Sequence, residues 1–222
     1  MLSVRGRRPT EVLIEPIARG LLKARVSPNV VTVVGAAGAT LVAVLLIPAG
    51  YLTLAAILSG LFAASDLIDG AMARLRDSGT RFGATLDATC DRITDGALFA
   101  AITYWLVDSY NAHGALVAAS LTVLVCSQVT SYVKARGEAN GFRMEGGLVE
   151  RAERLIIGLV GLGLHGVGVP YAIDVALWLL AVGSVFTVVQ RLRMAAKDPA
   201  AGEPTAPPAG GAGARQRARR PR

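Results

Sequence analysis

The feature that most limits how this chain can fold is a long run without charge, residues 30–47. A helix of this length crosses the hydrocarbon core of a bilayer, which is about 30 Å thick. The 222-residue chain is 53% hydrophobic with a mean hydropathy of +0.49. A soluble protein of this size would need more polar surface than its residues could supply. The 25 glycines and few aromatic residues of this chain suit helices that pack closely in lipid. The sequence therefore predicts an all-α integral membrane protein.

Six apolar segments are expected to be transmembrane helices. Their approximate limits are 28–47, 51–74, 82–107, 115–134, 149–164 and 173–189. Ser27 and Pro28 form a good N-cap and first-turn pair, so the first of these helices should begin there. Residues 10–26 instead place charged side chains along one face of a helical pattern, which is typical of an amphipathic helix in the membrane interface. A soluble cap packed on the bundle is the alternative for this segment.

The chain accordingly divides into three predicted regions. Residues 1–27 form a basic N-terminus with the interfacial helix, and residues 28–197 form the six-helix transmembrane domain. Residues 198–222 are rich in Pro, Gly, Ala and Arg without periodicity, so we expect a disordered basic tail. This tail could contact anionic membrane lipids through its positive charge.

The net charge of +7 is distributed by topology and does not form one basic surface. Lys and Arg cluster at the termini and in two internal loops, whereas the three opposite loops contain neither. These opposite loops are residues 48–51, 108–114 and 165–172. The positive-inside rule then places both termini in the cytoplasm, which predicts a multi-pass protein of a cell membrane. Nucleic-acid binding is excluded because it requires a presented basic face.

Four aspartates interrupt the apolar segments. Asp66 and Asp69 are three residues apart and Asp87 and Asp91 are four apart, so each pair shares one helix face. Ionisable residues inside a bilayer are costly and indicate a functional site. Four carboxylates at close range require a cation, and their hard oxygen donors suit Mg²⁺, Mn²⁺ or Ca²⁺. The charge distribution puts this site near the cytoplasmic surface.

Three further residues indicate phosphate chemistry at the aspartates. Gly70 and Gly83 remove side chains where a ligand or partner helix must approach, and Arg74 could bind a phosphate. A carboxylate that is not fully committed to metal could accept a proton from an attacking hydroxyl. Two other classes of function remain open from the residues alone. A cation transporter would use the aspartates as an ion path, and a structural membrane anchor would leave them unexplained.

The spacing Asp66-x2-Asp69-Gly70-x2-Ala73-Arg74-x8-Gly83-x3-Asp87-x3-Asp91 resembles the signature of the CDP-alcohol phosphotransferase family. The likeness covers approximately residues 10–195. It implies a binuclear metal centre, usually Mg²⁺ with Mn²⁺ possible, held by Asp66, Asp69, Asp87 and Asp91. It also implies that Asp91 is the general base and that CMP is the leaving group. The residues that match contacts to the CDP-linked lipid donor are Asn29, Val30, Val31, Thr32, Gly70, Arg74 and Thr80.

The acceptor alcohol must be inferred from basic residues outside this signature. Ser131, Lys134, Arg151 and Arg154 flank one cytoplasmic connection and could converge near the metals. So much positive charge favours a phosphorylated acceptor over a neutral one. Segments 131–136 and 150–155 resemble the actinobacterial branch of the family that makes phosphatidylinositol phosphate. That resemblance implies myo-inositol phosphate as acceptor, bound by Ser131, Lys134 and Arg154 with help from Arg191, and a bacterial membrane. Glycerol 3-phosphate, the acceptor of phosphatidylglycerophosphate synthases, is the nearest alternative, and the family precedent is a homodimer.

Overall fold

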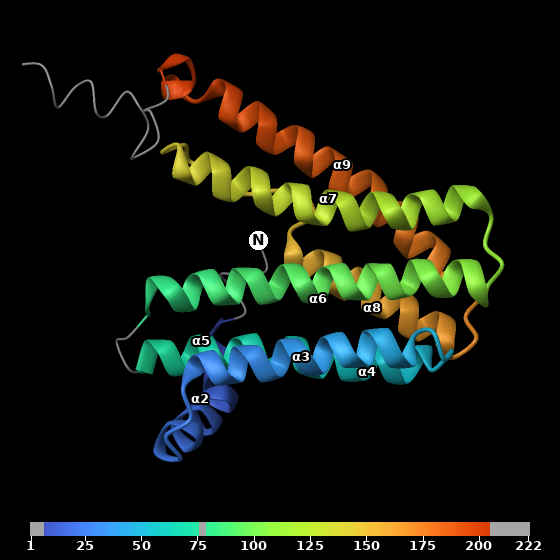
Figure 1. Cartoon of the computed structure of the whole chain (residues 1–222), viewed down its shortest axis with the longest axis horizontal. Coiled ribbons are helices and arrows are strands. Elements are labelled where there is room, and N and C mark those ends of the chain that lie inside the picture. Colours follow the sequence, from blue (N-terminus) through green and yellow to red (C-terminus); the bar gives the residue numbers. More distant parts are fainter. Residues whose placement is uncertain (1–6, 76–78, 205–222) are drawn as a thin grey trace, which may run out of the picture.

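The computed structural model describes residues 7–75 and 79–204, and this part of the chain is helical, with no β-strand. Its helices are α2 (Arg7–Lys23), α3 (Pro28–Leu46), α4 (Leu52–Ala63), α5 (Ser65–Leu75), α6 (Arg81–Asp108), α7 (Gly114–Ala139), α8 (Arg151–Gly166), α9 (Ala172–Lys197) and the 3₁₀ turn η1 (Pro199–Gly202). Helices α3 to α7 run along one long axis, α8 and α9 cross them obliquely, and α2 leaves one end at an angle (Figure 1).

The helices that build the site begin at specific caps. Ser27 accepts a hydrogen bond from the Val30 amide and Pro28 occupies the first turn of α3, which confirms the predicted start. Thr80 caps α6 by accepting the Gly83 amide at 2.9 Å. Helix α8 begins with a capping box in which the side chains of Glu150 and Glu153 each accept a backbone N–H. Such caps satisfy amides that lack helical partners, and they fix where each helix starts.

The predicted single helix over residues 51–74 is two helices in the structure. Helix α4 ends at Ala63 and α5 begins at Ser65, whose hydroxyl donates to the Phe62 carbonyl at 2.6 Å. Gly35 of α3 lies against Ser65 so closely that a Cβ at Gly35 would overlap its hydroxyl. The break therefore lies where α3 presses on the α4–α5 junction, directly before the first aspartate.

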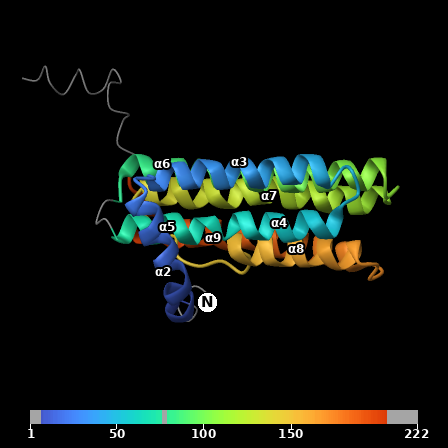
Figure 2. The ribbon, with the colours of Figure 1, turned by 90° about the horizontal axis from the view of Figure 1, so that it is seen from below.

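Four stretches are long and apolar enough to cross a membrane: Pro28–Leu46, Leu52–Leu75, Gly114–Ala139 and Ala172–Lys197. Helix α6 has the length, but it carries charged residues in its first half, and α8 has 16 residues. Both lie beside the four candidate spans within one bundle, as the two views show (Figure 2). The predicted six-span count therefore remains a prediction for α6 and α8.

The core fills the part of the bundle distant from α2. Most of its largest fully buried residues come from α6, α8 and α9, with one each from the end of α3 and from α7: Phe99, Ile102, Leu106, Leu162, Ile173, Leu177, Leu180, Ile47 and Val123. A second, small core joins α2 to α5 through Ala18 and Met72, both of which are fully buried. The apolar face of the predicted N-terminal helix thus packs on α5, and its position in a membrane interface stays a prediction.

The predicted tail begins with regular structure. Asp198 accepts the Ala200 amide and caps η1, so residues 199–202 form a 3₁₀ turn and are not irregular. The rest of the predicted disordered tail, residues 205–222, and the basic residues 1–6 lie outside the described residues.

Candidate active site

Three of the four predicted metal ligands meet in the structure. Asp66 and Asp69 on α5 and Asp87 on α6 each offer a carboxylate oxygen, and these oxygens all lie within 4.8 Å of one another. Divalent cations hold oxygen ligands at about 2.0–2.6 Å, so oxygens separated by roughly 4–5 Å can share one ion. The donor set and its spacing therefore fit a hard divalent cation. The i,i+3 spacing on α5 supplies two carboxylates to this cluster, as the sequence predicts.

A hydroxyl from a third helix fixes the most buried of these carboxylates. Asp69 is 7% exposed, and the Thr32 hydroxyl of α3 donates to its Oδ2 at 2.5 Å. The family resemblance predicts that Thr32 contacts the CDP-linked lipid. It gives no indication of this hydrogen bond to Asp69. A hydrogen bond of this kind orients a metal ligand before the metal arrives.

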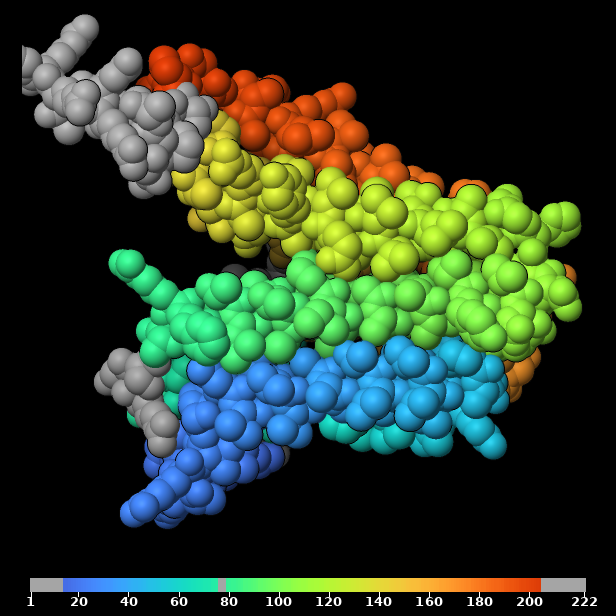
Figure 3. All heavy atoms as spheres, in the orientation of Figure 1, coloured from blue at the N-terminus to red at the C-terminus, as the bar shows by residue number. Residues whose placement is uncertain are grey.

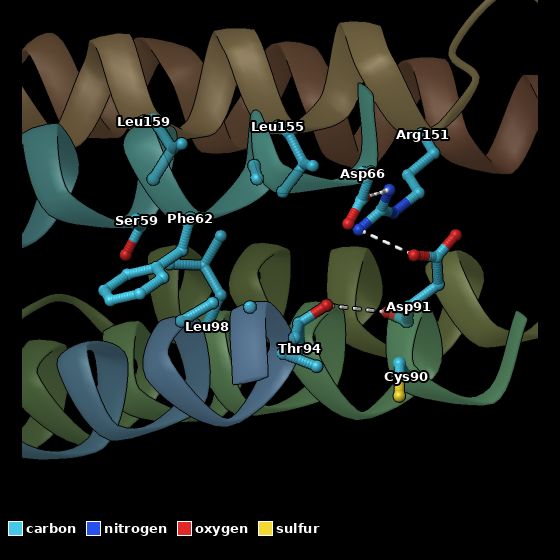
Figure 4. A pocket seen from close by; sticks show the side chains of 14 residues that line it. Ser59, Phe62, Asp66, Cys90, Asp91, Thr94, Leu98, Arg151, Leu155 and Leu159 are labelled. Carbon is cyan, nitrogen blue, oxygen red and sulfur yellow. Dashed lines mark hydrogen bonds and ion pairs between the residues drawn. The ribbon is translucent and has the colours of Figure 1, made fainter. Parts of the chain in front are cut away.

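Asp91 has a different partner. Its Oδ1 lies 2.9 Å from Nη2 of Arg151, and Nη1 of the same guanidinium lies 2.6 Å from Oδ2 of Asp66 (Figure 4). A small cavity of about 30 Å³ opens beside these three side chains, and Phe62 and Leu98 form part of its apolar wall. Arg151 thus bridges α5 and α6. The sequence places Arg151 among the basic residues that could converge near the metals, but it does not predict these contacts to Asp66 and Asp91.

A buried ion pair lies behind Asp91. Arg154 is 1% exposed, and its Nη2 lies 2.5 Å from Oδ2 of the fully buried Asp95. Arg92 Nη2 lies 3.7 Å from the same oxygen and 3.8 Å from Asp91. Arg154, a predicted acceptor contact, therefore already has a carboxylate partner, which the sequence did not predict. Buried charges are stable only when paired in this way.

The predicted acceptor residues line one cavity. Ser131, Lys134, Arg154 and Arg191 all face a space of about 1050 Å³, together with Asp91. Figure 3 shows its opening as a hollow between α6 and α7. Its charged lining comprises five cations and three anions, a balance of +2: Arg92, Lys134, Arg151, Arg154, Arg191, Asp91, Glu138 and Glu150. This charge suits an anionic ligand.

Arg191 is held in place at the base of the acceptor cavity. The guanidinium is buried, and Nη1 donates to the Thr130 carbonyl at 2.8 Å. Nε donates to the Gly146 carbonyl at 3.4 Å, and Nη2 lies 3.4 Å from Glu150. Lys134 is different, because it is 45% exposed and its amine lies 3.9 Å from Glu138. The cavity therefore combines a buried, hydrogen-bonded cation with an exposed one.

A second cavity of about 360 Å³ contains most of the predicted donor contacts. Asn29, Thr32, Gly70 and Thr80 line it beside two predicted metal ligands, Asp69 and Asp87. The sequence predicts that a neighbouring group approaches Gly83, and that group is the Asn29 side chain. A Cβ added at Gly83 would lie 3.2 Å from Asn29 Oδ1.

Three predicted donor contacts do not line this second cavity. Val30 is 51% exposed, and Val31 packs against the small core between α2 and α5. Arg74 reaches back along α5 toward Gly70, and its Nη1 lies 3.4 Å from the position of a Cβ there. The guanidinium of Arg74 therefore lies close to the cavity that Gly70 lines.

The comparisons with known proteins agree on one family. A family model described as CDP-alcohol phosphatidyltransferase matches residues 25–189. The phosphatidylinositol phosphate synthase of Corynebacterium glutamicum is 66% identical over 210 residues, which cover 95% of this chain and 96% of that protein. The enzyme of the same name from Mycobacterium tuberculosis is 50% identical over 189 residues, covering 84% of this chain and 87% of that protein.

Two crystal structures of the M. tuberculosis phosphatidylinositol phosphate synthase share the fold. The structure with CDP-DAG bound gives a TM-score of 0.83 at 48% identity, covering 87% of this chain and 98% of that chain. The complex with manganese and citrate also gives 0.83, at 47% identity, covering 90% of this chain and 96% of that chain. The resemblance thus extends over the whole bundle that carries the two cavities and the acidic cluster.

Proposed function

The chain belongs to the CDP-alcohol phosphatidyltransferase family, and from that premise we propose that it transfers the phosphatidyl group of CDP-diacylglycerol to myo-inositol phosphate, releasing CMP. The observation that carries this proposal is the position of the aspartates between two cavities. Asp69 and Asp87 line the cavity of the predicted donor contacts, and Asp91 lines the cationic cavity. A donor in the cavity lined by Asn29 and Thr80 and an acceptor in the cationic cavity would meet at these carboxylates.

The proposed ligands of the binuclear Mg²⁺ centre are Asp66, Asp69, Asp87 and Asp91, with Mn²⁺ as the alternative metal. Such ions, when bound, neutralise a diphosphate and stabilise the departing CMP. Asp66, Asp69 and Asp87 already converge, whereas Asp91 contacts Arg151. We therefore assign Asp91 two roles, metal contact and general base.

The donor is oriented by groups that the chain presents around the second cavity. Asn29 and Thr80 offer polar side chains at the starts of α3 and α6, and Gly70 leaves the α5 backbone uncovered. Arg74 supplies a guanidinium for the diphosphate from one helical turn further along. In the transfer step, Asp91 accepts the proton of an inositol hydroxyl. The resulting alkoxide oxygen bonds to the β-phosphorus of the donor, and the bond to CMP breaks with its electron pair leaving on CMP.

The acceptor is proposed to be a phosphate monoester because of the charge in the acceptor cavity. Arg154 and Arg191 are nearly fully buried there, whereas Lys134 is exposed and Ser131 is partly exposed. A neutral polyol would gain little from these cations, whereas a phosphate accepts charge-assisted hydrogen bonds from several donors at once. Glycerol 3-phosphate satisfies the same argument and is the competing acceptor.

We further propose six membrane spans with both termini and the active site at the cytoplasmic face of a bacterial cell membrane, in a homodimer. The connections α3–α4, α6–α7 and α8–α9 gather at one end of the bundle (Figure 1). These are the connections without Lys or Arg. Both substrate cavities lie toward the other end, which supports a cytoplasmic site.

Purified protein with CDP-diacylglycerol tests the proposal. CMP release is expected to require myo-inositol phosphate and Mg²⁺ or Mn²⁺, and Asp91→Asn should abolish it. Asp108→Asn, at the exposed far end of the same helix, is the matched control and should keep full activity. Incorporation of radiolabelled glycerol 3-phosphate but not inositol phosphate would refute the acceptor. Metal flux through proteoliposomes without CMP release would refute the enzyme and support a transporter.

A further inference from the structure

We propose that Arg151 is a built-in counter-cation of the metal centre, which neutralises Asp66 and Asp91 until metal binds and then turns to the acceptor phosphate. This inference rests on the proposed function. It assigns a positioning role to a residue that lies outside the aspartate signature.

The contacts of Arg151 place its positive charge among the ligands. Nη1 lies 2.6 Å from Asp66 Oδ2, and Nη2 lies 2.9 Å from Asp91 Oδ1. Asp66 is also one of the three carboxylates whose oxygens converge within 4.8 Å. One carboxylate is therefore shared between the guanidinium and the cation site. The two arms of the guanidinium span the space between α5 and α6.

A divalent cation and this guanidinium compete for the same carboxylates. Like charges near a shared ligand repel, and the interaction is strong because the site is largely removed from water. Binding of metal to Asp66 and Asp91 therefore requires Arg151 to release at least one of them. Without metal, the guanidinium supplies the cation that closely spaced carboxylates need.

The released side chain has a place to go. Arg151 lines both the small cavity beside Asp66 and the acceptor cavity. Its Nε is buried with no hydrogen-bond partner, and lies 3.6 Å from Asp95 Oδ1, so the present arrangement leaves one donor unused. The backbone at this point is fixed by the capping box of α8 and by the buried pair of Arg154 with Asp95. Only the side chain needs to move.

A merely structural role makes the opposite prediction for metal affinity. If Arg151 held Asp66 and Asp91 in position for the metal, its removal would weaken metal binding. If Arg151 competes with the metal, its removal strengthens binding. The sign of the change therefore separates the two roles without any measurement of catalysis.

The test is Mn²⁺ binding to the purified protein without substrates, followed by electron paramagnetic resonance of free Mn²⁺. Arg151→Gln is expected to lower the Mn²⁺ Kd by about tenfold, the scale on which groups that contact metal ligands act. Arg92→Gln removes the same charge from beside Asp91 without a contact to Asp66, and its effect should be clearly smaller. An unchanged or higher Kd in Arg151→Gln refutes the proposal, as does an equal gain in Arg92→Gln.

Two further measurements complete the test. Arg151→Lys keeps the charge if the glutamine variant does not fold, but one ammonium cannot bridge two carboxylates. Its Mn²⁺ Kd should fall between those of the other two proteins, and a value at or above wild type refutes the proposal. Saturating Mn²⁺ should raise the affinity of the wild type for inorganic phosphate, and less so in Arg151→Gln. CMP release is measured separately, so failure here leaves the proposed reaction standing.

Discussion

The hydrogen bond from Thr32 to Asp69 gives the sharpest prediction about the metal centre. Thr32→Val keeps the shape of the side chain and removes the hydroxyl that donates to Asp69 Oδ2 at 2.5 Å. Both residues are nearly fully buried, so Asp69 loses a fixed donor that solvent replaces only from the cavity that the two residues line. We expect weaker metal binding, because Asp69 would then be oriented only by its packing.

The size of the effect follows from the charge on the acceptor. A hydrogen bond to a charged group contributes about 1.5–3 kcal/mol. At about 1.4 kcal/mol per factor of ten, this corresponds to a loss of roughly 10- to 100-fold in metal affinity if the whole bond is expressed in binding. Measured effects of groups that orient metal ligands span a similar range. An Asp69 oxygen that no longer accepts this hydrogen bond is a stronger donor to the metal. The expected loss of metal affinity is therefore nearer tenfold than 100-fold.

The assay is CMP release as a function of Mg²⁺ concentration at saturating CDP-diacylglycerol, with Mn²⁺ binding measured in parallel. Thr32→Val should shift both curves to higher metal concentration, with activity restored at high metal. Thr40→Val is the matched control, since Thr40 lies on the same helix and its hydroxyl is buried without a hydrogen-bond partner. A rise in the KM for CDP-diacylglycerol with an unchanged metal requirement would refute the reasoning. Thr32 would then contact the lipid substrate and not position a metal ligand.

Two further predictions concern stability and packing. Asp95→Asn leaves buried Arg154 without its anion and should lower the free energy of unfolding by about 3–5 kcal/mol, seen as a lower thermal midpoint in detergent. The double variant Asp95→Leu with Arg154→Met should recover most of this stability. A double variant no more stable than Asp95→Asn contradicts this. Gly35→Ala forces a Cβ against Ser65 and should cost about 1–3 kcal/mol and reduce CMP release. Gly20→Ala meets no atom within 4 Å and should leave both unchanged or improved; equal losses in both variants would disprove the clash.

Much of the acidic cluster could be predicted from spacing alone. Positions 66 and 69 share a face on any helix, so two of the three converging carboxylates follow from local geometry. Asp87 joins them because α5 and α6 both pack on α3, which brings their carboxylates together. Asp91 lies four residues after Asp87 and shares its helix face, yet its partner in the structure is Arg151. That contact joins helices far apart in the sequence, and no periodicity in either helix encodes it.

The same distinction explains the differences in the substrate cavities. Lys134 was predicted from the need for positive charge near a phosphate and Arg191 from the family resemblance, and both line one cavity in the structure. The ion pair of Arg154 with Asp95 was not predicted, because 59 positions separate the two residues. Val30 follows Asn29 in the sequence but faces outward, since neighbouring residues on a helix point in different directions.

The sequence by itself determined that the chain is helical, that it carries carboxylates for a divalent cation and that residues suited to a phosphate lie beside them. These are properties of short segments, set by apolar length, by capping residues such as Ser27 and by intervals of three and four along a helix. Only the tertiary structure decided where α4 gives way to α5, which carboxylates converge and which is held by an arginine. Those outcomes depend on packing between helices: Gly35 against Ser65, and Arg151 against Asp66 across 85 positions of the chain.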